Sequence, residues 1–170
     1  MLIFLVGYAG SGKSSLGKRL ARRLGVKFID TDKEVELSEG ASVADIFHYG
    51  GEEYFRKSER MTVERVANDG IDMVVATGGG LPTWQDNMEW MIRSGIVIYL
   101  RRSPEQILSR LSAYGREKRP MFRGKSDEEL LVFMRQQMAE RERFYRMAHY
   151  EVDCTTMCDD DMVEMIVNKL

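Results

Sequence analysis

The chain has 170 residues and a mass of 19.6 kDa, with 44% apolar and 31% charged residues and a formal net charge of −2 at pH 7. This length and composition provide a real hydrophobic core and exclude a disordered protein, while the near balance of charge argues against broad nucleic-acid binding. The apolar runs are far too short to cross a bilayer, and the sequence shows neither a secretory signal nor enough cysteines for a disulfide framework. We therefore expect one cytoplasmic domain with no membrane and no nucleic-acid partner.

The first half of the chain alternates apolar runs with segments of helical periodicity. An apolar strand is expected at Leu2–Val6, and after a glycine-rich turn Leu16, Leu20 and Leu24 recur every four residues, as on the buried face of a helix. The next expected elements are a strand at Val26–Asp30, a helix from Thr31 to about Gly40 with a Thr31–Glu34 capping box, a short helix from Ser42, a longer helix over Glu52–Ala67 and a strand at Asp72–Ala76.

The same alternation continues in the second half. The expected elements are a helix around Thr83–Arg93, strands at Ile96–Leu100 and Tyr150–Cys154, and helices from Ser103, from Ser126 with Glu129 to about Met147, and over Met162–Leu170. Between them, Tyr114–Ser126 breaks all periodicity and carries five basic residues, so we interpret it as a mobile loop. Strands that alternate with helices predict a single α/β domain over residues 1–170, built on a parallel sheet.

The strongest chemical signal is the segment from Gly7 to Ser14, which matches G-x-x-x-x-G-K-[ST] between an apolar strand and an amphipathic helix. In this motif the glycines allow successive backbone N–H groups to face a phosphate, and the helix N-terminus adds partial positive charge. Lys13 is expected to reach the β- and γ-phosphates and Ser14 to ligate Mg²⁺. The motif therefore predicts a site for a nucleoside triphosphate.

Two aspartates stand at the end of the second expected strand. Asp30 and Asp32 lie at i and i+2, so in extended chain they point the same way, toward the end of the sheet where ligands bind. One carboxylate is suited to the metal shell and the other to orienting or deprotonating an acceptor hydroxyl. The spacing fits equally well a helix cap at either position, and it leaves both interpretations open.

Three consecutive glycines, Gly78–Gly80, follow the third strand. They indicate either a turn with positive φ or a backbone that another group approaches closely. On the preceding helix, Arg56 has Glu59 at i+3, which by itself predicts only a weak surface ion pair.

The basic residues of the second half carry less positional information. Arginines on the 114–126 loop are suited to closing on a transferring phosphate and excluding water. Arg141 lies in a run of alternating charges, and the spacing does not separate it from Arg143 or Arg146.

Taken in order along the chain, these residues resemble the shikimate kinase family, which belongs to the P-loop kinases. The resemblance covers nearly the whole chain. It rests on the phosphate loop, Phe28–Asp32, Ala44–Phe47, Gly51–Arg56, Gly78–Gly80, Arg119 with Pro120, and Met138–Arg141 with Tyr145 and Arg146.

The resemblance implies a five-stranded parallel sheet of order 2-3-1-4-5 with helices on both faces, an acceptor-binding region at about residues 31–60 and a mobile lid at about 113–126. It further implies ATP-dependent phosphorylation of the 3-hydroxyl of shikimate, a step toward chorismate and the aromatic amino acids, by a monomer that uses Mg²⁺.

The resemblance also implies roles for individual residues. The catalytic residues are Lys13, Asp32 and Arg119. The ATP-binding residues are Gly10, Ser11, Gly12, Lys13, Ser14, Ser15, Arg110 and Arg119. The shikimate-binding residues are Asp32, Arg56, Gly78, Gly79, Gly80 and Arg141, and the Mg²⁺ ligands are Ser14 and Asp30. One feature departs from the family pattern, because the segment Thr155–Cys158 lacks the basic residue that many relatives place after the last strand.

Other functions stay open on the residues alone. A gluconate or nucleoside monophosphate kinase shares the phosphate loop, and a non-catalytic nucleotide-binding module needs no acceptor pocket at all. A nucleic-acid-handling NTPase fits poorly with the net charge and the length of the chain.

Overall fold

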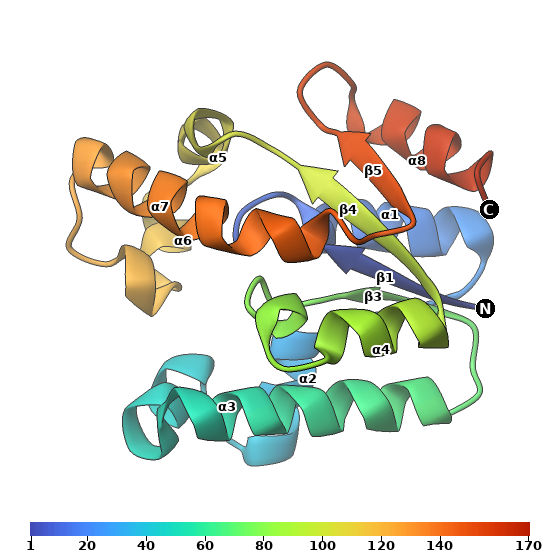
Figure 1. Cartoon of the computed structure of the whole chain (residues 1–170), viewed down its shortest axis with the longest axis horizontal. Coiled ribbons are helices and arrows are strands. Elements are labelled where there is room, and N and C mark those ends of the chain that lie inside the picture. Colours follow the sequence, from blue (N-terminus) through green and yellow to red (C-terminus); the bar gives the residue numbers. More distant parts are fainter.

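All 170 residues are described by a computed structural model. Five parallel strands form one sheet in the order β2-β3-β1-β4-β5 (Figure 1). The strands are β1 (Leu2–Val6), β2 (Lys27–Asp30), β3 (Met73–Ala76), β4 (Ile96–Arg101) and β5 (Tyr150–Asp153). The expected α/β class, parallel sheet and strand order are confirmed.

Strand β1 lies at the centre of the sheet, and its side chains alternate between two cores. Phe4 and Val6 enter a core on one face, while Ile3 and Leu5 enter a second core on the other. Because both faces are buried, every strand position must be apolar, which explains the continuous hydrophobic run in the sequence.

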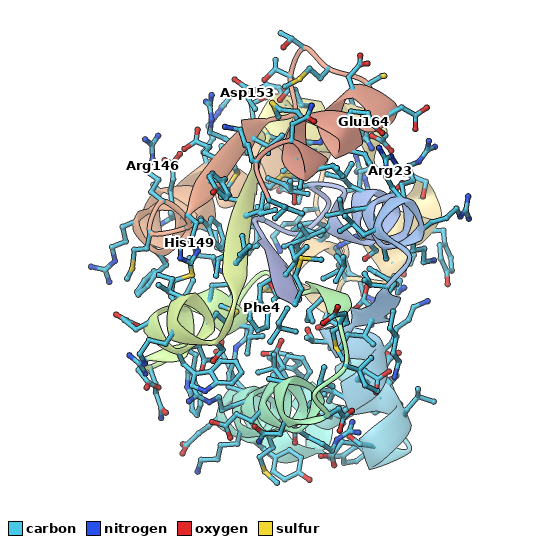
Figure 2. The ribbon with its side chains drawn as sticks, turned by 90° about the vertical axis from the view of Figure 1, so that its right-hand side faces the viewer. Phe4, Arg23, Arg146, His149, Asp153 and Glu164 are labelled. Carbon is cyan, nitrogen blue, oxygen red and sulfur yellow. The ribbon has the colours of Figure 1, made fainter.

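Helices cover both faces of the sheet, as expected. Helices α1 (Lys13–Leu24) and α8 (Asp159–Val167) lie side by side on one face, and α4 (Asn87–Ser94) and α7 (Asp127–Tyr145) lie on the other (Figure 2). An ion pair between Arg23 Nε and Glu164 Oε1, at 2.6 Å, links α1 to α8. The remaining helical segments are α2 (Thr31–Glu39), α3 (Val43–Asn68), η1 (Leu81–Thr83), α5 (Pro104–Arg110), α6 (Ala113–Glu117) and η2 (Pro120–Phe122).

Helix starts agree with the capping signals at two sites and differ at a third. The capping boxes that begin α5 at Ser103 and α7 at Ser126 are both present. The predicted box at Thr31 is wrong, because Asp30 caps α2 by accepting from the Asp32 N–H. The Thr31 hydroxyl is instead buried and accepts from the Gly78 N–H at 2.9 Å, which ties α2 to the loop after β3.

Three helix boundaries differ from the sequence expectation. The two helices expected from Ser42 and over Glu52–Ala67 follow each other directly, with only a kink at Gly51 (φ 77°) between them. Helix α4 begins at Asn87 rather than Thr83, because a 3₁₀ turn precedes it. Helix α8 begins at Asp159 rather than Met162, because the acidic side chains in its first turn interact favourably with the positive end of the helix dipole and so stabilise the helix there.

The segment 114–126 is not an irregular loop. Helix α6 begins where the Ser112 hydroxyl accepts from the Gly115 N–H, and a 3₁₀ turn follows at Pro120–Phe122. Phe122 is fully buried and its ring lies 6.3 Å from that of Tyr8. The sequence gives no sign of these turns because a single buried phenylalanine produces no periodicity.

No helix in the structure is long and apolar enough to pass through a membrane.

Replacing Thr31 by Val tests the link between α2 and the loop after β3. The change keeps the shape of the side chain but leaves the buried Gly78 N–H without an acceptor, which costs about 1–3 kcal/mol. We expect the free energy of unfolding in urea to fall by that amount. Thr31→Ser, which keeps the hydroxyl, should recover most of it, and equal losses in both variants would contradict the assignment.

Candidate active site at the carboxyl ends of the strands

The loops that follow β1, β2 and β3 meet the end of α5 and the start of α6 around a cleft of about 310 Å³. Most of the predicted site residues line it. They are Gly10, Gly12, Lys13, Ser14, Ser15, Asp30, Asp32, Gly78, Gly79, Arg110 and Arg119. Ser11, Arg56, Gly80 and Arg141 do not line this cleft; the first three are buried and Arg141 is half-buried.

The phosphate loop has the conformation that its glycines predict. Gly7, Gly10 and Gly12 all have positive φ angles, of 146°, 82° and 98°. These angles suit residues without a Cβ, and they curl the backbone around the cleft ahead of α1, which begins at Lys13. The loop therefore presents the N-terminus of a 12-residue helix to the space where a phosphate would sit.

Lys13 is buried within this loop. Its Nζ donates to the carbonyl oxygens of Gly7 at 2.7 Å and Tyr8 at 2.8 Å. Burial lowers the pKa of Lys13 to about 8, although the carboxylate of Asp32 acts in the opposite direction. The ammonium group is thus held in a fixed position, and an incoming anion would restore its ordinary basicity.

Asp30 caps α2 and also faces the phosphate loop. Its Oδ1 accepts from the Asp32 N–H at 3.2 Å and so caps α2, while its Oδ2 accepts from the Ser14 hydroxyl at 2.5 Å. The two oxygens of one carboxylate face different partners. The Ser14–Asp30 pair therefore offers two adjacent hard oxygen atoms at the edge of the cleft.

Asp32 faces the cleft from the first turn of α2 and is half-buried. Burial and the nearby Asp30 raise its pKa to about 6, and Lys13 and Arg56 only partly offset this. A carboxylate with a pKa near neutrality is well matched to accepting a proton from a hydroxyl.

The ion pair between Arg56 and Glu59 is buried, so the expectation of a surface pair was wrong. Arg56 is 6% exposed and Glu59 is 0% exposed. Arg56 Nη1 donates to Glu59 Oε2, and its guanidinium lies 5.3 Å from the ring of Phe55. Burial raises the pKa of Glu59 to about 8 against the opposing effect of Arg56. The i+3 spacing predicts the pair itself but does not reveal its burial.

The three glycines serve to let other side chains approach the backbone closely, and not to form a turn with positive φ. None of Gly78–Gly80 has a positive φ. A Cβ at Gly80 would collide with the Arg56 guanidinium, and one at Gly78 would lie 2.7 Å from Asp32 Oδ1 and even closer to Glu59 Oε1. The glycines therefore make room for charged side chains from α2 and α3.

Arg141 differs from Arg143 and Arg146 on α7 in its burial and in its partners. Arg143 and Arg146 are exposed, whereas Arg141 is half-buried, with its guanidinium 5.9 Å from the ring of Tyr8. No carboxylate lies within 4.0 Å of Arg141, unlike Arg146, which pairs with Glu142 at 3.0 Å. Arg141 is thus a free cation near Gly79, where a Cβ would lie 3.6 Å from its Nη1.

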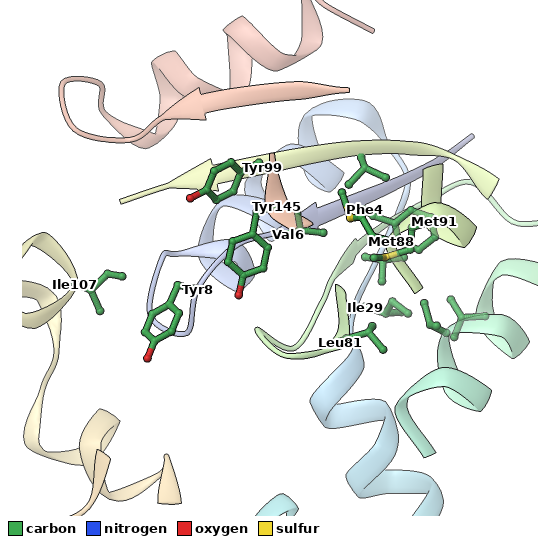
Figure 3. Packing of buried hydrophobic residues seen from close by; sticks show 14 of the residues in the cluster. Phe4, Val6, Tyr8, Ile29, Leu81, Met88, Met91, Tyr99, Ile107 and Tyr145 are labelled. Atoms are coloured by element: carbon green, nitrogen blue, oxygen red, sulfur yellow. The ribbon is translucent and has the colours of Figure 1, made fainter. Parts of the chain in front are cut away.

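Two tyrosines that sequence analysis did not assign complete this wall. The Tyr145 hydroxyl donates to the Gly79 carbonyl at 2.6 Å, and the Tyr8 hydroxyl donates to Gln137 Oε1 at 2.6 Å. Both rings are buried and carry their hydroxyl groups away from the strands (Figure 3). A tyrosine in an apolar pattern suggests a buried ring with a bonded hydroxyl, but the sequence does not show which group the hydroxyl bonds.

Arg119 reaches the cleft from the 114–126 segment. Its Nη1 donates to the Gly115 carbonyl at 2.8 Å, and burial lowers its pKa against the opposing effects of Asp32 and Asp30. Arg110, at the end of α5, is exposed and lines the outer part of the cleft. Both arginines add positive charge to the lining of the cleft.

A parallel sheet of this order, a phosphate loop on its central strand and an acidic and basic pocket beside that loop define a P-loop kinase. Comparison with known proteins narrows the class. The family model for shikimate kinase matches residues 9–170, so the chain belongs to the shikimate kinase family.

Individual relatives agree over the full length. The chain is 40% identical over 168 residues to the shikimate kinase of Bacteroides fragilis, covering 99% of this chain and 93% of that protein. Its structure resembles the crystal structure of shikimate kinase from Bacteroides thetaiotaomicron, with a TM-score of 0.91, 35% identity and coverage of 100% and 99% of the two chains. It also resembles shikimate kinase from Acinetobacter baumannii in complex with shikimate, with a TM-score of 0.88, 33% identity and coverage of 99% and 91%.

Gly80→Ala tests whether the glycine makes room for Arg56. The backbone at Gly80 (φ −91°) accepts any residue, so the added methyl group should displace the Arg56 guanidinium without unfolding the chain. We expect the dissociation constant for shikimate, measured by calorimetry, to rise by about ten-fold or more, as for loss of a charged hydrogen bond. Because the displaced guanidinium also leaves the buried Glu59, the melting temperature should fall, while the circular dichroism spectrum should stay that of the folded parent. Unchanged shikimate affinity would show that Arg56 does not need this space.

Proposed function

We propose that this cleft carries out the family's reaction, the ATP-dependent phosphorylation of shikimate, at the 3-hydroxyl of the ring, giving shikimate 3-phosphate and ADP. The observation that carries the proposal is the position of the Asp32 carboxylate. It lies beside the buried Lys13 of the phosphate loop and in front of Arg56, and Lys13 and Arg56 both act on its pKa. The product places the reaction on the route to chorismate and the aromatic amino acids.

The nucleotide phosphates bind over the segment Gly10–Ser15. Inward N–H groups and the start of α1 hold the β- and γ-phosphates, Lys13 bridges them, and Arg110 lies against the adenine side. Binding of the phosphates replaces the two carbonyl partners of the Lys13 ammonium with a stronger, charged partner.

Ser14 and Asp30 are the residues that would hold Mg²⁺. Their oxygens are adjacent and hard, as this ion requires. Such a sparse protein ligand set suits Mg²⁺, which keeps several waters and phosphate oxygens as ligands. When bound, the ion neutralises charge on the phosphates.

The acceptor binds on the opposite wall. Arg141, which has no carboxylate partner, and Arg56, whose guanidinium lies against Gly80, together hold the carboxylate of shikimate. The planar fork of arginine suits a carboxylate because it donates two parallel hydrogen bonds. Gly78 and Gly79 contribute backbone contacts, and Asp32 binds the ring hydroxyl that reacts.

Transfer then proceeds by in-line displacement. The hydroxyl oxygen forms a bond to the γ-phosphorus as the bond from that phosphorus to the β–γ bridging oxygen breaks, and the hydroxyl proton passes to Asp32. Arg119, carried by the lid over residues 113–126, neutralises charge on the moving group and excludes water. Residues 31–60 form the acceptor-binding region, and the enzyme works as a cytoplasmic monomer.

Purified protein offered MgATP with shikimate, gluconate, AMP, CMP or no acceptor tests the proposal directly. We expect ADP release only with shikimate, with the product identified by phosphorus NMR as the 3-phosphate, and none from a Lys13→Ala variant. Equal ADP release in every reaction would instead identify an NTPase without a specific acceptor.

Arg141→Lys tests the carboxylate assignment. Lysine keeps the charge but cannot form the paired hydrogen bonds, so we expect KM for shikimate to rise by about ten-fold or more while kcat changes little. Arg143→Lys is the matched control, since Arg143 lies two residues away on the same helix and is exposed. The assignment is wrong if both variants have the KM of the parent protein.

The pKa values of Asp32 and Lys13 predict a bell-shaped dependence of kcat/KM on pH. Asp32 must be ionised to accept a proton, so activity should rise as pH passes about 6. Lys13 must be protonated to hold phosphate, so activity should fall as pH passes about 8. Steady-state kinetics of Asp32→Asn should lose the acidic limb, and those of Lys13→Arg should lose the alkaline limb, because arginine does not deprotonate in this range.

A further inference from the structure

Besides Arg56, one other arginine is buried, and none of the motifs described above includes it. Arg102 follows directly after β4 and is only 8% exposed. Its Nε donates to the Ser11 carbonyl at 2.8 Å, and its Nη1 donates to the Cys154 carbonyl at 2.9 Å. One guanidinium thus joins the phosphate loop to the loop between β5 and α8.

The charge of Arg102 is not neutralised by the protein. No carboxylate lies within 4.0 Å of it, whereas the adjacent Arg101 pairs with Glu151 and Asp153, each at 2.6 Å. Carbonyl oxygens are uncharged, so they do not offset the positive charge that the buried guanidinium exerts on nearby groups. A Cβ at Gly12 would lie 3.9 Å from Arg102 Nη2 and 3.8 Å from Arg110 Nη2, so two cations converge on this part of the loop.

The hydrogen bond to Ser11 fixes the direction of the next N–H group. In a trans peptide the C=O and the N–H point in opposite directions, so a Ser11 carbonyl directed at Arg102 sends the Gly12 N–H the other way. Gly12 lines the cleft, and its N–H makes no hydrogen bond within the protein. The Gly12 N–H is therefore a free donor facing the cleft.

Without Arg102, this peptide would have little to hold it. Gly12 has no Cβ to oppose rotation of the Ser11–Gly12 peptide plane, and its φ of 98° lies where glycine moves freely. A charged donor on the carbonyl also polarises the peptide and strengthens the opposite N–H as a donor.

We propose that Arg102 is a positioning residue for the nucleotide phosphates, an inference that rests on the nucleotide site proposed above. It holds the Ser11–Gly12 peptide with its N–H toward the phosphates, and it locks the phosphate loop to Cys154, at the start of a loop that has no basic residue of its own. Arg102 does not line the cleft and acts through the backbone.

Calorimetric titration of Arg102→Met with four probes tests this role. We expect the dissociation constants of MgADP and magnesium pyrophosphate to rise by a similar factor of about ten or more, because both depend on the oriented N–H. Adenosine, which carries no phosphate, and shikimate should bind as they do to the parent protein. Arg101→Met is the matched control and should bind all four probes normally.

Two further measurements keep the test decisive. Arg102→Lys can donate to only one of the two carbonyls, so its affinity for MgADP should lie between those of the parent protein and Arg102→Met. If Arg102→Met does not fold, Arg102→Lys provides the test in its place. In the ¹⁵N spectrum, the Gly12 amide should shift on addition of MgADP in the parent protein and much less in Arg102→Lys.

The possible failures are distinguishable. If the parent protein does not bind MgADP, the proposed function itself is wrong. If the parent protein binds MgADP and both Arg102→Met and Arg102→Lys bind it as tightly as the parent does, the positioning role is wrong. It is also wrong if affinity for adenosine and shikimate falls by the same factor as affinity for MgADP, since that pattern reports general damage to the fold.

Discussion

Burial of charge at one end of the sheet is the constraint on which the site depends. Lys13 is enclosed by the backbone of the phosphate loop, and its charge would be costly there without the carboxylates of Asp32 and Asp30 nearby. The same enclosure raises the pKa of Asp32, and Lys13 and Arg56 limit that rise. The pKa values of Asp32 and Lys13 are therefore coupled, and each depends on the position of the other side chain.

The parallel topology makes this coupling possible. Strands β1, β2 and β3 end at the same edge of the sheet, so loops that are far apart in sequence share one small space. Crowding explains why glycines follow β3: the guanidinium of Arg56 and the carboxylates of Asp32 and Glu59 occupy the volume that side chains at Gly78 and Gly80 would need. Glu59 pairs with Arg56, whereas Arg141 has no carboxylate within 4.0 Å.

The phosphate loop is also in contact with the segment that delivers Arg119. The Tyr8 ring packs on Phe122, and the Tyr8 hydroxyl bonds Gln137, whose amide nitrogen in turn lies 3.6 Å from the sulfur of Met121. Residues on α7 thus contact both the phosphate loop and the segment 113–126. A displacement of 113–126 would change the packing of Phe122 on Tyr8.

The sequence alone determined the features whose information lies in consecutive residues. The phosphate loop, the capping boxes at Ser103 and Ser126 and the buried strands depend on local spacing, and resemblance to a family supplied the strand order. Tertiary structure decided the rest. The burial of Glu59, the difference between Arg141 and its neighbours, and the partners of Arg102 all depend on which distant segment packs against each side chain. Local spacing describes one face of one helix, whereas desolvation and pairing of a charge are set by contacts between elements.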